Sequence, residues 1–259
     1  MKKYRLFKLS IMLSLVGLPI LGYFAWTTFG STKVNVTLTT NPDLKNGLVG
    51  HWTFDGPDLK QNAADSSGQG NTGYLTSFDA TTTTRGKLGQ ALSFDGVDDY
   101  VNSGLTTEEI GAITTISLWA KTSTSTTQTL IGARDLGGTN YLYWFSMEST
   151  GKLQLYIRSV SIFVGPVNSA KSDDKWHHYV VSYIGGSTTA SFYVDGAFVG
   201  TGSSNAVTAS SNQNRPLFLG AVNAGSSLSG FLNGSLDDVR IYNRALSQEE
   251  ITQLYNLGR

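Results

Sequence analysis

Short apolar stretches separated by turn-forming residues are the feature of this sequence that most restricts its fold. From residue 46 to the last dozen residues, no run has the spacing of a long amphipathic helix. Instead, clusters of Gly, Asn, Asp and Ser recur between short stretches of alternating or continuous apolar residues. The apolar runs are Leu48–Phe54, Ala91–Phe94, Tyr100–Ser103, Thr114–Lys121, Thr129–Ala133, Tyr141–Glu148, Lys152–Arg158, Ser161–Pro166, His177–Tyr183, Thr189–Val194, Ala197–Gly200, Leu217–Ala221 and Phe231–Tyr242. This pattern predicts an all-β fold of about a dozen antiparallel strands, arranged as a sandwich or barrel.

Two local signals fix details of that prediction. Asp195-Gly196 stands between two apolar runs, which predicts a type I′ hairpin turn because that turn needs positive φ at both central residues. Ala245–Asn256 has apolar residues at helical spacing, and Ser247 with Glu250 forms a capping-box pattern. We therefore expect one short helix at the carboxyl end.

The composition excludes several classes of protein. Lys plus Arg and Asp plus Glu both number 19 in 259 residues, so the chain is formally neutral and lacks the concentrated positive charge that nucleic-acid binding requires. It has no Cys, which removes disulfides, thiolate metal sites and cysteine nucleophiles. Its three His residues leave little material for a zinc site. We expect no nucleic-acid partner.

The amino end predicts contact with a membrane. Residues 1–8 carry four positive charges and no negative one, and the 21 residues Leu9–Phe29 are uncharged and mostly apolar. Residues 1–30 are thus either a cleaved signal peptide or, as the length of the run favours, an uncleaved helical anchor. Residues 31–45 then form a polar spacer, and residues 46–259 form one domain outside the cytoplasm, membrane-anchored or secreted.

Seven segments, in order along the chain, resemble one family. They are GLVGHWTFD (residues 47–55), DSSGQGNTG (65–73), GQALSFDGVDDYV (89–101), ISLW (116–119), KWHH (175–178), YVDG (193–196) and LDDVRIYNRAL (236–246). Together they resemble the laminin-G-like jelly-roll domains of the concanavalin A-like lectin/glucanase group, over most of the chain from about residue 47 onward.

The resemblance implies two antiparallel sheets packed face to face, with the first and last strands, Leu48–Phe54 and Leu236–Tyr242, paired. It also implies a binding function, since such domains commonly recognise carbohydrate or a protein partner and often hold a calcium ion. The expected role is a non-catalytic extracytoplasmic binding or adhesion module. The alternatives are a surface or envelope structural protein without a small ligand, and a glycoside hydrolase.

The carboxylates argue against the hydrolase. Glycoside hydrolysis needs two carboxylates flanking one cleft, and the glucanase relatives carry them as alternating acidic residues on a single strand. None of the five Glu fits that pattern: Glu108 and Glu109 are expected in a loop, Glu249 and Glu250 lie in the expected terminal helix, and the fifth is Glu148. His177 and His178 follow each other on a strand, so one ring is expected in the interior and the other at the surface. We expect no catalytic residues.

Five residues are candidate calcium ligands. Asp65 and Asn71 bound a loop rich in oxygen donors and glycine, as a flexible oxygen cage for calcium requires. Asp237 or Asp238 of the last strand, and Asp55 after the first, are the further candidates. Ordinary turn chemistry explains the same Asp, Asn and Gly residues equally simply. Asp98-Asp99 is interpreted as a hairpin turn rather than a ligand pair.

Aromatic residues cluster on the strand Tyr141–Phe145. Strand alternation places Tyr141, Tyr143 and Phe145 on one face and Trp144 on the other. Exposed rings on a strand would suit stacking on sugars, but packing in the core or beneath a second layer is the favoured interpretation for each ring. The remaining strand tryptophans, Trp52, Trp119 and Trp176, are expected in the core.

Overall fold

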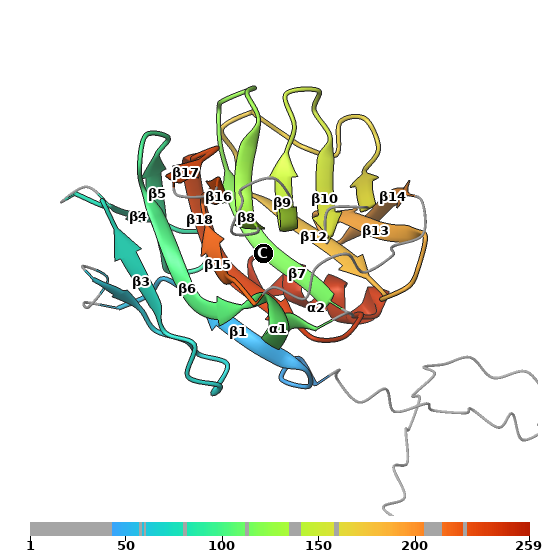
Figure 1. Ribbon diagram of the computed structural model, residues 1–259, viewed down its shortest axis with the longest axis horizontal. Helices are drawn as coiled ribbons and strands as arrows, with labels where there is room; N and C mark the ends of the chain where they lie inside the picture. Colours follow the sequence, from blue (N-terminus) through green and yellow to red (C-terminus); the bar gives the residue numbers. More distant parts are fainter. Residues whose placement is uncertain are drawn as a thin grey trace, which may run out of the picture. The chain divides into compact units, whose positions relative to one another are not determined.

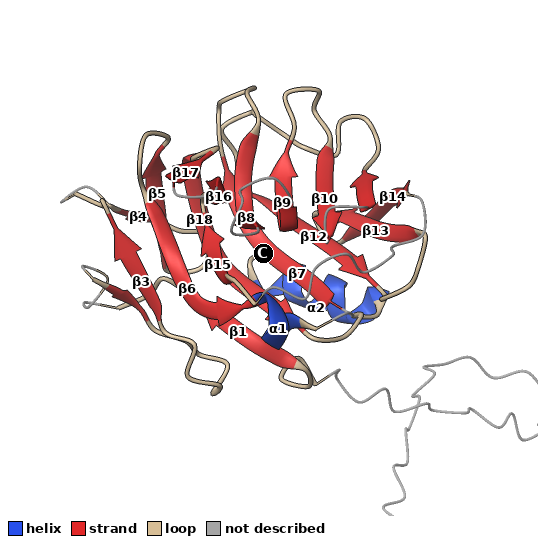
Figure 2. Cartoon of the chain, viewed as in Figure 1, coloured by secondary structure: helices blue, strands red, loops and turns tan. Residues whose placement is uncertain are grey.

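The structure is a computed structural model, and it describes residues 43–56, 59, 61–79, 82–111, 114–134, 141–157, 161–204, 214–224 and 227–259. Strands dominate these ranges, and the helices are short (Figure 2). The expected amino-terminal helix and almost all of the spacer lie outside them. Within the described ranges, no helix has the length and apolar character needed to cross a membrane.

The first sheet, sheet A, contains eight antiparallel strands (Figure 1). In spatial order they are β14 (Ala197–Ser203), β13 (Thr189–Val194), β12 (His177–Tyr183), β7 (Thr114–Lys121), β18 (Asn233–Tyr242), β5 (Gln90–Asp95) and β4 (Thr83–Arg85), and β1 (Leu48–Trp52) pairs with β18. Trp52 lies opposite Val239, and Leu48 lies opposite Tyr242. The expected pairing of the first and last strands is therefore confirmed.

The second sheet, sheet B, also has eight strands. Their order is β11 (Ser161–Val164), β10 (Leu153–Ile157), β9 (Tyr141–Met147), β8 (Gln128–Arg134), β15 (Pro216–Leu219), β6 (Tyr100–Thr106), β3 (Gly73–Thr76) and β2 (Asn62–Ala63). A separate hairpin, β16 (Val222–Ala224) and β17 (Ser227–Ser229), follows β15. The described strands thus outnumber those expected, because several are only two to four residues long and carry little periodicity.

The core lies between the two sheets because each strand turns alternate residues inward. Along β10, Leu153, Leu155 and Ile157 are buried, whereas Gln154 and Tyr156 are partly exposed. One cluster of buried apolar residues joins the inward faces of both sheets. The turn between β13 and β14 has φ of 52° at Asp195 and 76° at Gly196, which confirms the predicted type I′ geometry.

Helix α2 (Gln248–Leu257) packs on the opposite face of sheet A. The Ser247 side chain accepts from the Glu250 N–H, and the Glu250 carboxylate accepts from the Ser247 N–H, so the capping box is confirmed. Ile251 and Leu254 pack against Val180 and Tyr242 of the sheet. Truncating either helix residue to Ala should cost about 2–5 kcal/mol.

Three expectations need correction or refinement. Glu108 and Glu109, expected in a loop, lie in the single-turn helix α1 (Thr107–Ile110), where Glu109 accepts from the Thr106 N–H. Trp176 precedes β12 and is only partly buried, because it lies in the connection rather than on the strand. Trp119 is buried as expected, but its ring stacks on Tyr255 of α2 instead of lying between the sheets.

Candidate functional site

A row of mostly aromatic and amide side chains crosses the outward face of sheet B. Register pairs each member directly with the next: Tyr156 with Trp144, Trp144 with Gly132, Gly132 with Phe218, Phe218 with Asn102, Asn102 with Tyr74, and Tyr74 with Asn62. We call these residues the outer row. Their neighbours along each strand point into the core, so the row lies on the face that α2 does not cover.

Trp144 and Tyr156 form the aromatic end of the outer row. Their ring centroids are 5.2 Å apart with an interplanar angle of 32°, and both side chains are partly exposed. The Trp144 Nε1–H donates to Thr129 Oγ1 at 3.0 Å, which fixes the orientation of the indole. Tyr143 and Phe145 are buried in the core as expected, so only alternate residues of β9 present rings outward.

Polar side chains continue this surface toward the end of the β9–β10 hairpin. Gln154, two residues before Tyr156, is partly exposed and pairs with Ser146, which lies two residues beyond Trp144 and is fully buried. The Ser146 hydroxyl donates to Glu148 Oε1 at 3.2 Å. Rings followed by an amide and a carboxylate along one hairpin match the composition of a sugar-binding surface, where rings stack and polar groups orient the ligand.

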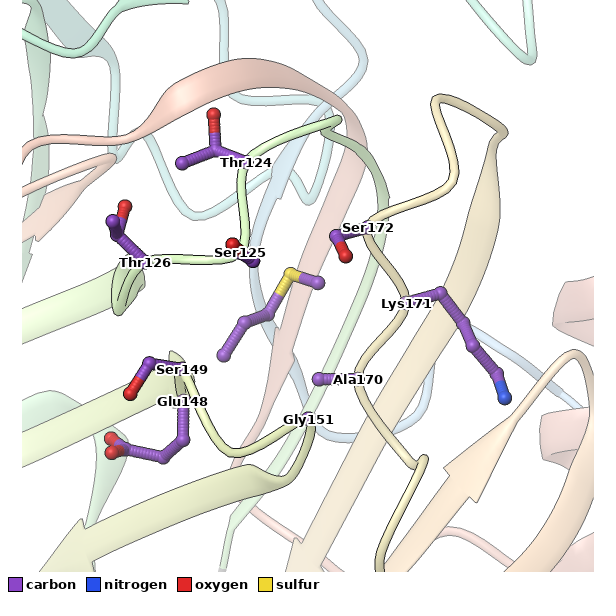
Figure 3. A pocket seen from close by; sticks show the side chains of 10 residues that line it. Thr124, Ser125, Thr126, Glu148, Ser149, Gly151, Ala170, Lys171 and Ser172 are labelled. Atoms are coloured by element: carbon purple, nitrogen blue, oxygen red, sulfur yellow. The ribbon is translucent and has the colours of Figure 1, made fainter.

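A cavity of about 50 Å³ adjoins this hairpin at one end of the sandwich (Figure 3). It is lined by the end of β9 and by residues of three loops: Met147, Thr124, Ser125, Thr126, Glu148, Ser149, Gly151, Ala170, Lys171 and Ser172. Figure 3 shows the Lys171 side chain extending away from the cavity, while Ser125 and Ser172 lie on opposite walls. The lining is therefore rich in hydroxyl groups, with Glu148 connecting the cavity to the outward face of β9.

Asp65 and Asn71 act as turn residues in this structure. Asp65 Oδ1 accepts from the backbone N–H groups of His51 and Ser67, and Oδ2 accepts from Ser67 Oγ and the Asn71 N–H. Partial burial opposes ionisation of Asp65, but these hydrogen bonds outweigh it and lower its pKa. The Asn71 amide donates to the Val49 carbonyl at 2.8 Å, so both side chains hold the loop against β1.

Asp237 is the least satisfied of the candidate ligands. Its side chain is fully buried, Oδ2 accepts from the Leu88 N–H at 2.8 Å, and Oδ1 is buried without a hydrogen-bond partner. Burial, with the nearby charge of Asp238, raises the pKa of Asp237 to about 7. Asp55 reaches the same 86–90 turn, since its Oδ1 accepts from the Gln90 N–H at 2.8 Å.

Asp238 has different hydrogen-bond partners from Asp237, at a point where β18 departs from regular strand alternation, since Leu236 and Val239 both lie in the core. It accepts from Arg240 through both carboxylate oxygens at 3.0 Å and lies 2.6 Å from His51 Nε2. Burial opposes ionisation, yet the His51 hydrogen bond and the Arg240 charge hold its pKa below the usual value. Asp238 adopts φ of 46° at an irregularity in the pairing with β7. This carboxylate is a structural ion-pair partner.

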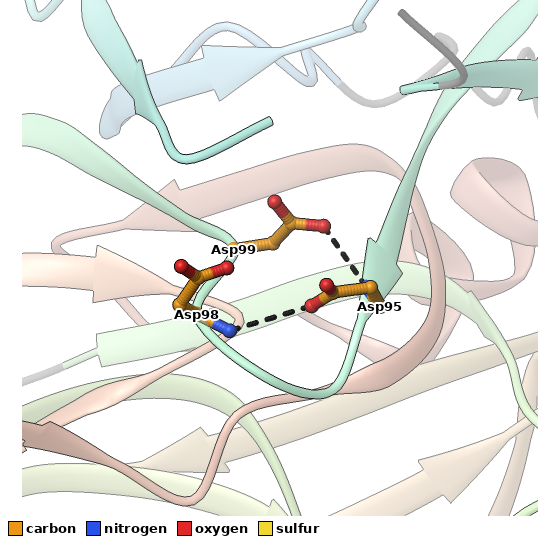
Figure 4. A group of neighbouring side chains, drawn as sticks. All are labelled: Asp95, Asp98 and Asp99. Carbon is orange, nitrogen blue, oxygen red and sulfur yellow. Dashed lines mark hydrogen bonds between the residues drawn. The ribbon is translucent and has the colours of Figure 1, made fainter. Parts of the chain in front are cut away.

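Asp95, Asp98 and Asp99 form an acidic cluster at the β5–β6 turn (Figure 4). Asp95 Oδ1 accepts from the N–H groups of Val97 and Asp98, and Asp99 Oδ2 accepts from the Asp95 N–H. The expected turn role of Asp98-Asp99 is confirmed. The turn is not a hairpin within one sheet, however, because β5 belongs to sheet A and β6 to sheet B.

The two adjacent histidines occupy the two environments that strand alternation predicts. His178 is buried beneath α2, where Nε2 lies 2.8 Å from Ser117 Oγ and Nδ1 has no partner. His177 is nearer the surface and lies between Asp195, at 2.8 Å, and Asp173, at 3.1 Å. The hydrogen bond to Asp195 is the largest cause that raises the pKa of His177. The contacts of both imidazole rings are thus with residues that hold the fold together.

The sequence interpretation missed most of the outer row. Gln154 and Tyr156 follow the alternation of Lys152–Arg158, in which Leu and Ile occupy the intervening positions. That period of two would have placed both side chains opposite the core. Tyr74, Asn62 and Phe218 lie on strands of two to four residues, which are too short for periodicity to reveal.

Two antiparallel sheets with adjacent first and last strands, and a terminal helix on one of them, define a jelly-roll sandwich. The family comparison agrees with this class. A laminin G-type family model described as the concanavalin A-like lectin/glucanases superfamily matches residues 95–252, more than half of the chain. The chain belongs to this superfamily, which confirms the resemblance. No curated protein sequence matches significantly.

Solved structures share the fold at low sequence identity. Domain 4 of AbnA, an extracellular arabinanase of Geobacillus stearothermophilus solved with arabinotriose, is 24% identical with a TM-score of 0.60, over 80% of this chain and 98% of that domain. The binding domain of Paraclostridial Mosquitocidal Protein 1 is 18% identical (TM-score 0.58; 83% of this chain, 53% of that one). Trypanosoma rangeli sialidase is 15% identical (TM-score 0.58; 86% and 35%). This chain therefore spans about half of the second protein and a third of the third.

Proposed function

We propose that this protein is a non-catalytic carbohydrate-binding module presented outside the cytoplasm. The observation that carries the proposal is the partly exposed Trp144–Tyr156 pair on sheet B, with Gln154 and Glu148 beside it. The rings offer flat apolar faces for the C–H groups of a sugar, and the amide and carboxylate offer acceptors and donors for its hydroxyls. Domain 4 of AbnA, solved with arabinotriose, supports a saccharide ligand for this fold.

The arrangement of carboxylates supports binding over hydrolysis. Glu109 and Glu250 are engaged in the capping of α1 and α2, and Glu148 is the only carboxylate among the residues lining the loop cavity. A glycosidase would need a second carboxylate facing the same cleft. Turnover of any glycan by the purified protein, abolished by Glu148→Gln, would establish the hydrolase instead.

A glycan array tests the binding proposal directly. The full chain in detergent, probed against neutral and acidic glycans including arabinotriose, should give saccharide binding that Trp144→Ala weakens by about fivefold or more, because loss of one stacked ring costs about 1–3 kcal/mol. Phe198→Ala is the matched control, since this aromatic side chain is 52% exposed on β14 of sheet A. A blank array, or equal loss in both variants, would refute the proposal and direct attention to protein partners.

A structural calcium ion belongs to the proposal, held by Asp237 and Asp55. The buried Oδ1 of Asp237 has no partner, and a divalent cation would neutralise the carboxylate that burial destabilises. Asp55 and Asp237 accept from the same turn, so oxygen donors from the segment after β1 and from β18 converge on it. Asp65, Asn71 and Asp238 are already engaged in hydrogen bonds. Asp237 and Asp55 are therefore favoured over the 65–71 loop as the calcium ligands. When bound, the ion would stiffen the junction of β1, β18 and the 86–90 turn.

Thermal unfolding with calcium and with chelator distinguishes a calcium site at Asp237 and Asp55 from one in the 65–71 loop. Calcium at a hundred times its Kd should add about 2.7 kcal/mol of stability. Asp237→Asn should abolish the calcium-dependent rise in Tm while stabilising the chelated protein, because it removes a buried carboxylate charge that no cation neutralises there. Asp65→Asn should keep the calcium response. Loss of the response in Asp65→Asn alone would place the ion in the 65–71 loop, and no response in the unmodified chain would exclude a calcium site.

Membrane anchoring through residues 9–29 completes the proposal. The 21 uncharged residues are long enough to span a bilayer, and the positive charges before them favour a cytoplasmic amino end. The mature chain should remain with the membrane fraction after alkaline extraction and retain residue 1 by mass spectrometry. A mature amino terminus near residue 30 would show a cleaved signal peptide and a secreted domain.

A further inference from the structure

The outer row does not end at Trp144. Beyond Gly132 it continues through Phe218 and Asn102 to Tyr74 and Asn62, each directly paired with the next. Tyr74 is 56% exposed, a large fraction for an aromatic ring on a sheet face. Its two cross-strand neighbours are both asparagines, so amide groups flank the ring on each side. This second half of the row repeats the combination of ring and polar side chain found at Trp144.

A further aromatic pair borders the same area. The rings of Tyr100 and Phe218 meet edge to face, with centroids 5.6 Å apart, and both side chains are partly exposed. The inward neighbours Val101, Leu217 and Leu219 are fully buried. The strands that carry these rings are therefore anchored by the core, and the ring positions are fixed before any ligand arrives, which lowers the entropic cost of binding.

The β16–β17 hairpin separates the two halves of the row. A Cβ atom added to Gly132 would lie 2.5 Å from Val222 Cβ, so the hairpin rests directly on the centre of the row. Asn223 holds it there: its Oδ1 accepts from the Arg134 N–H at 2.6 Å, and its amide donates to the Arg134 carbonyl at 3.4 Å. A ligand on Trp144 cannot continue flat across Gly132 to Phe218.

The chemistry of the row selects the ligand. Its seven members, all described, are Asn, Tyr, Asn, Phe, Gly, Trp and Tyr, so none carries a charge. An acidic glycan would find no cation along the row to offset the loss of its hydration. Rings and amides instead complement the alternating C–H faces and hydroxyls of a neutral sugar.

We propose a second saccharide subsite, formed by Tyr74, Asn62, Asn102 and Phe218, so that one domain binds two segments of neutral polysaccharide on either side of the β16–β17 hairpin. This inference rests on the proposed carbohydrate-binding function. Two sites on one rigid sheet raise the effective concentration of the second segment once the first is bound. The domain then holds long polysaccharides more tightly than short ones without any additional contact.

Calorimetric titration of the full chain with neutral trisaccharides that score on the array, beginning with xylotriose and cellotriose, tests the inference. The unmodified chain should bind two trisaccharides, Trp144→Ala and Tyr74→Ala one each, and the double variant none. Phe198→Ala should retain two. Tyr74 is exposed, so its substitution leaves the core intact, and an unchanged Tm verifies this.

The outcomes separate the two proposals. A blank array refutes the carbohydrate function and the second subsite together. One trisaccharide per unmodified chain, lost in Trp144→Ala and kept in Tyr74→Ala, leaves the carbohydrate function intact and overturns the second subsite. Stronger binding of sialylated or sulfated glycans than of neutral ones at Tyr74 overturns the assignment of ligand class. Asn102→Ala, which should weaken the second site at least threefold, gives an independent check.

Discussion

At the scale of single residues, His178 is a side chain whose protonation opposes folding. Its ring is buried under α2 against both Trp119 and Tyr255, and burial lowers its pKa from 6.5 to about 4. The unfolded chain therefore takes up this proton at higher pH than the folded one. Stability from this group is complete above pH 6.5 and is lost as the pH falls toward 4.

His178→Gln should reveal this contribution. The unmodified chain should lose about 3 kcal/mol more unfolding free energy than the variant between pH 7.5 and pH 4. Asp237, with its raised pKa, acts in the opposite direction by favouring the folded state as the pH falls, but it is common to both proteins and cancels in the difference. Urea unfolding at several pH values measures the two curves. Parallel curves would show that His178 is solvated or protonated in the folded state.

At the scale of elements, α2 depends on its amino-terminal cap. Ser247 and Glu250 cap each other reciprocally, and Glu250 also pairs with Arg244, whose guanidinium donates to the Asn46 carbonyl before β1. Ser247→Ala should cost about 1 kcal/mol. Glu250→Ala should cost more, because it also leaves Arg244 without its carboxylate. Ser227→Ala, on exposed β17, is the matched control. Thermal melts give the differences, and equal Tm values for Ser247→Ala and the control would contradict the role of the cap.

The elements also show what the sequence predicts and where prediction stops. Patterning identifies long strands such as β7, β12 and β18, the turn at Asp195 and the terminal helix, because each carries a local signal. It does not identify β2, β16 or β17, whose two or three residues are held by neighbouring strands. The roles of Asp237 and Asp65 likewise depend on which N–H groups approach each carboxylate, and tertiary packing alone decides that. The outer row forms only when six neighbouring strand pairs of sheet B adopt their observed pairing registers.

At the scale of the whole molecule, closure of sheet A joins the two ends of the domain. Trp52 pairs with Val239, and the Asn243 N–H donates to the Gly47 carbonyl. Contacts between residues so distant in sequence form slowly, since a long loop must close before they contribute. Folding should therefore be limited by this closure if β1 and β18 pair in the transition state.

A circular permutant tests that limit. Residues 41–259 form one compact unit, and α2, about 15 Å long, lies between the end of β18 and the carboxyl terminus. A linker of roughly 12 Gly and Ser residues can span that length and join residue 259 to residue 43, with new termini opened at the exposed turn around Gly186. Shortening the closing loop about fivefold lowers its entropic cost by about 1.4 kcal/mol, which corresponds to a folding rate about tenfold higher. Stopped-flow refolding measures it. An unchanged folding rate, with stability retained, would show that β1 joins β18 only after the rate-limiting step.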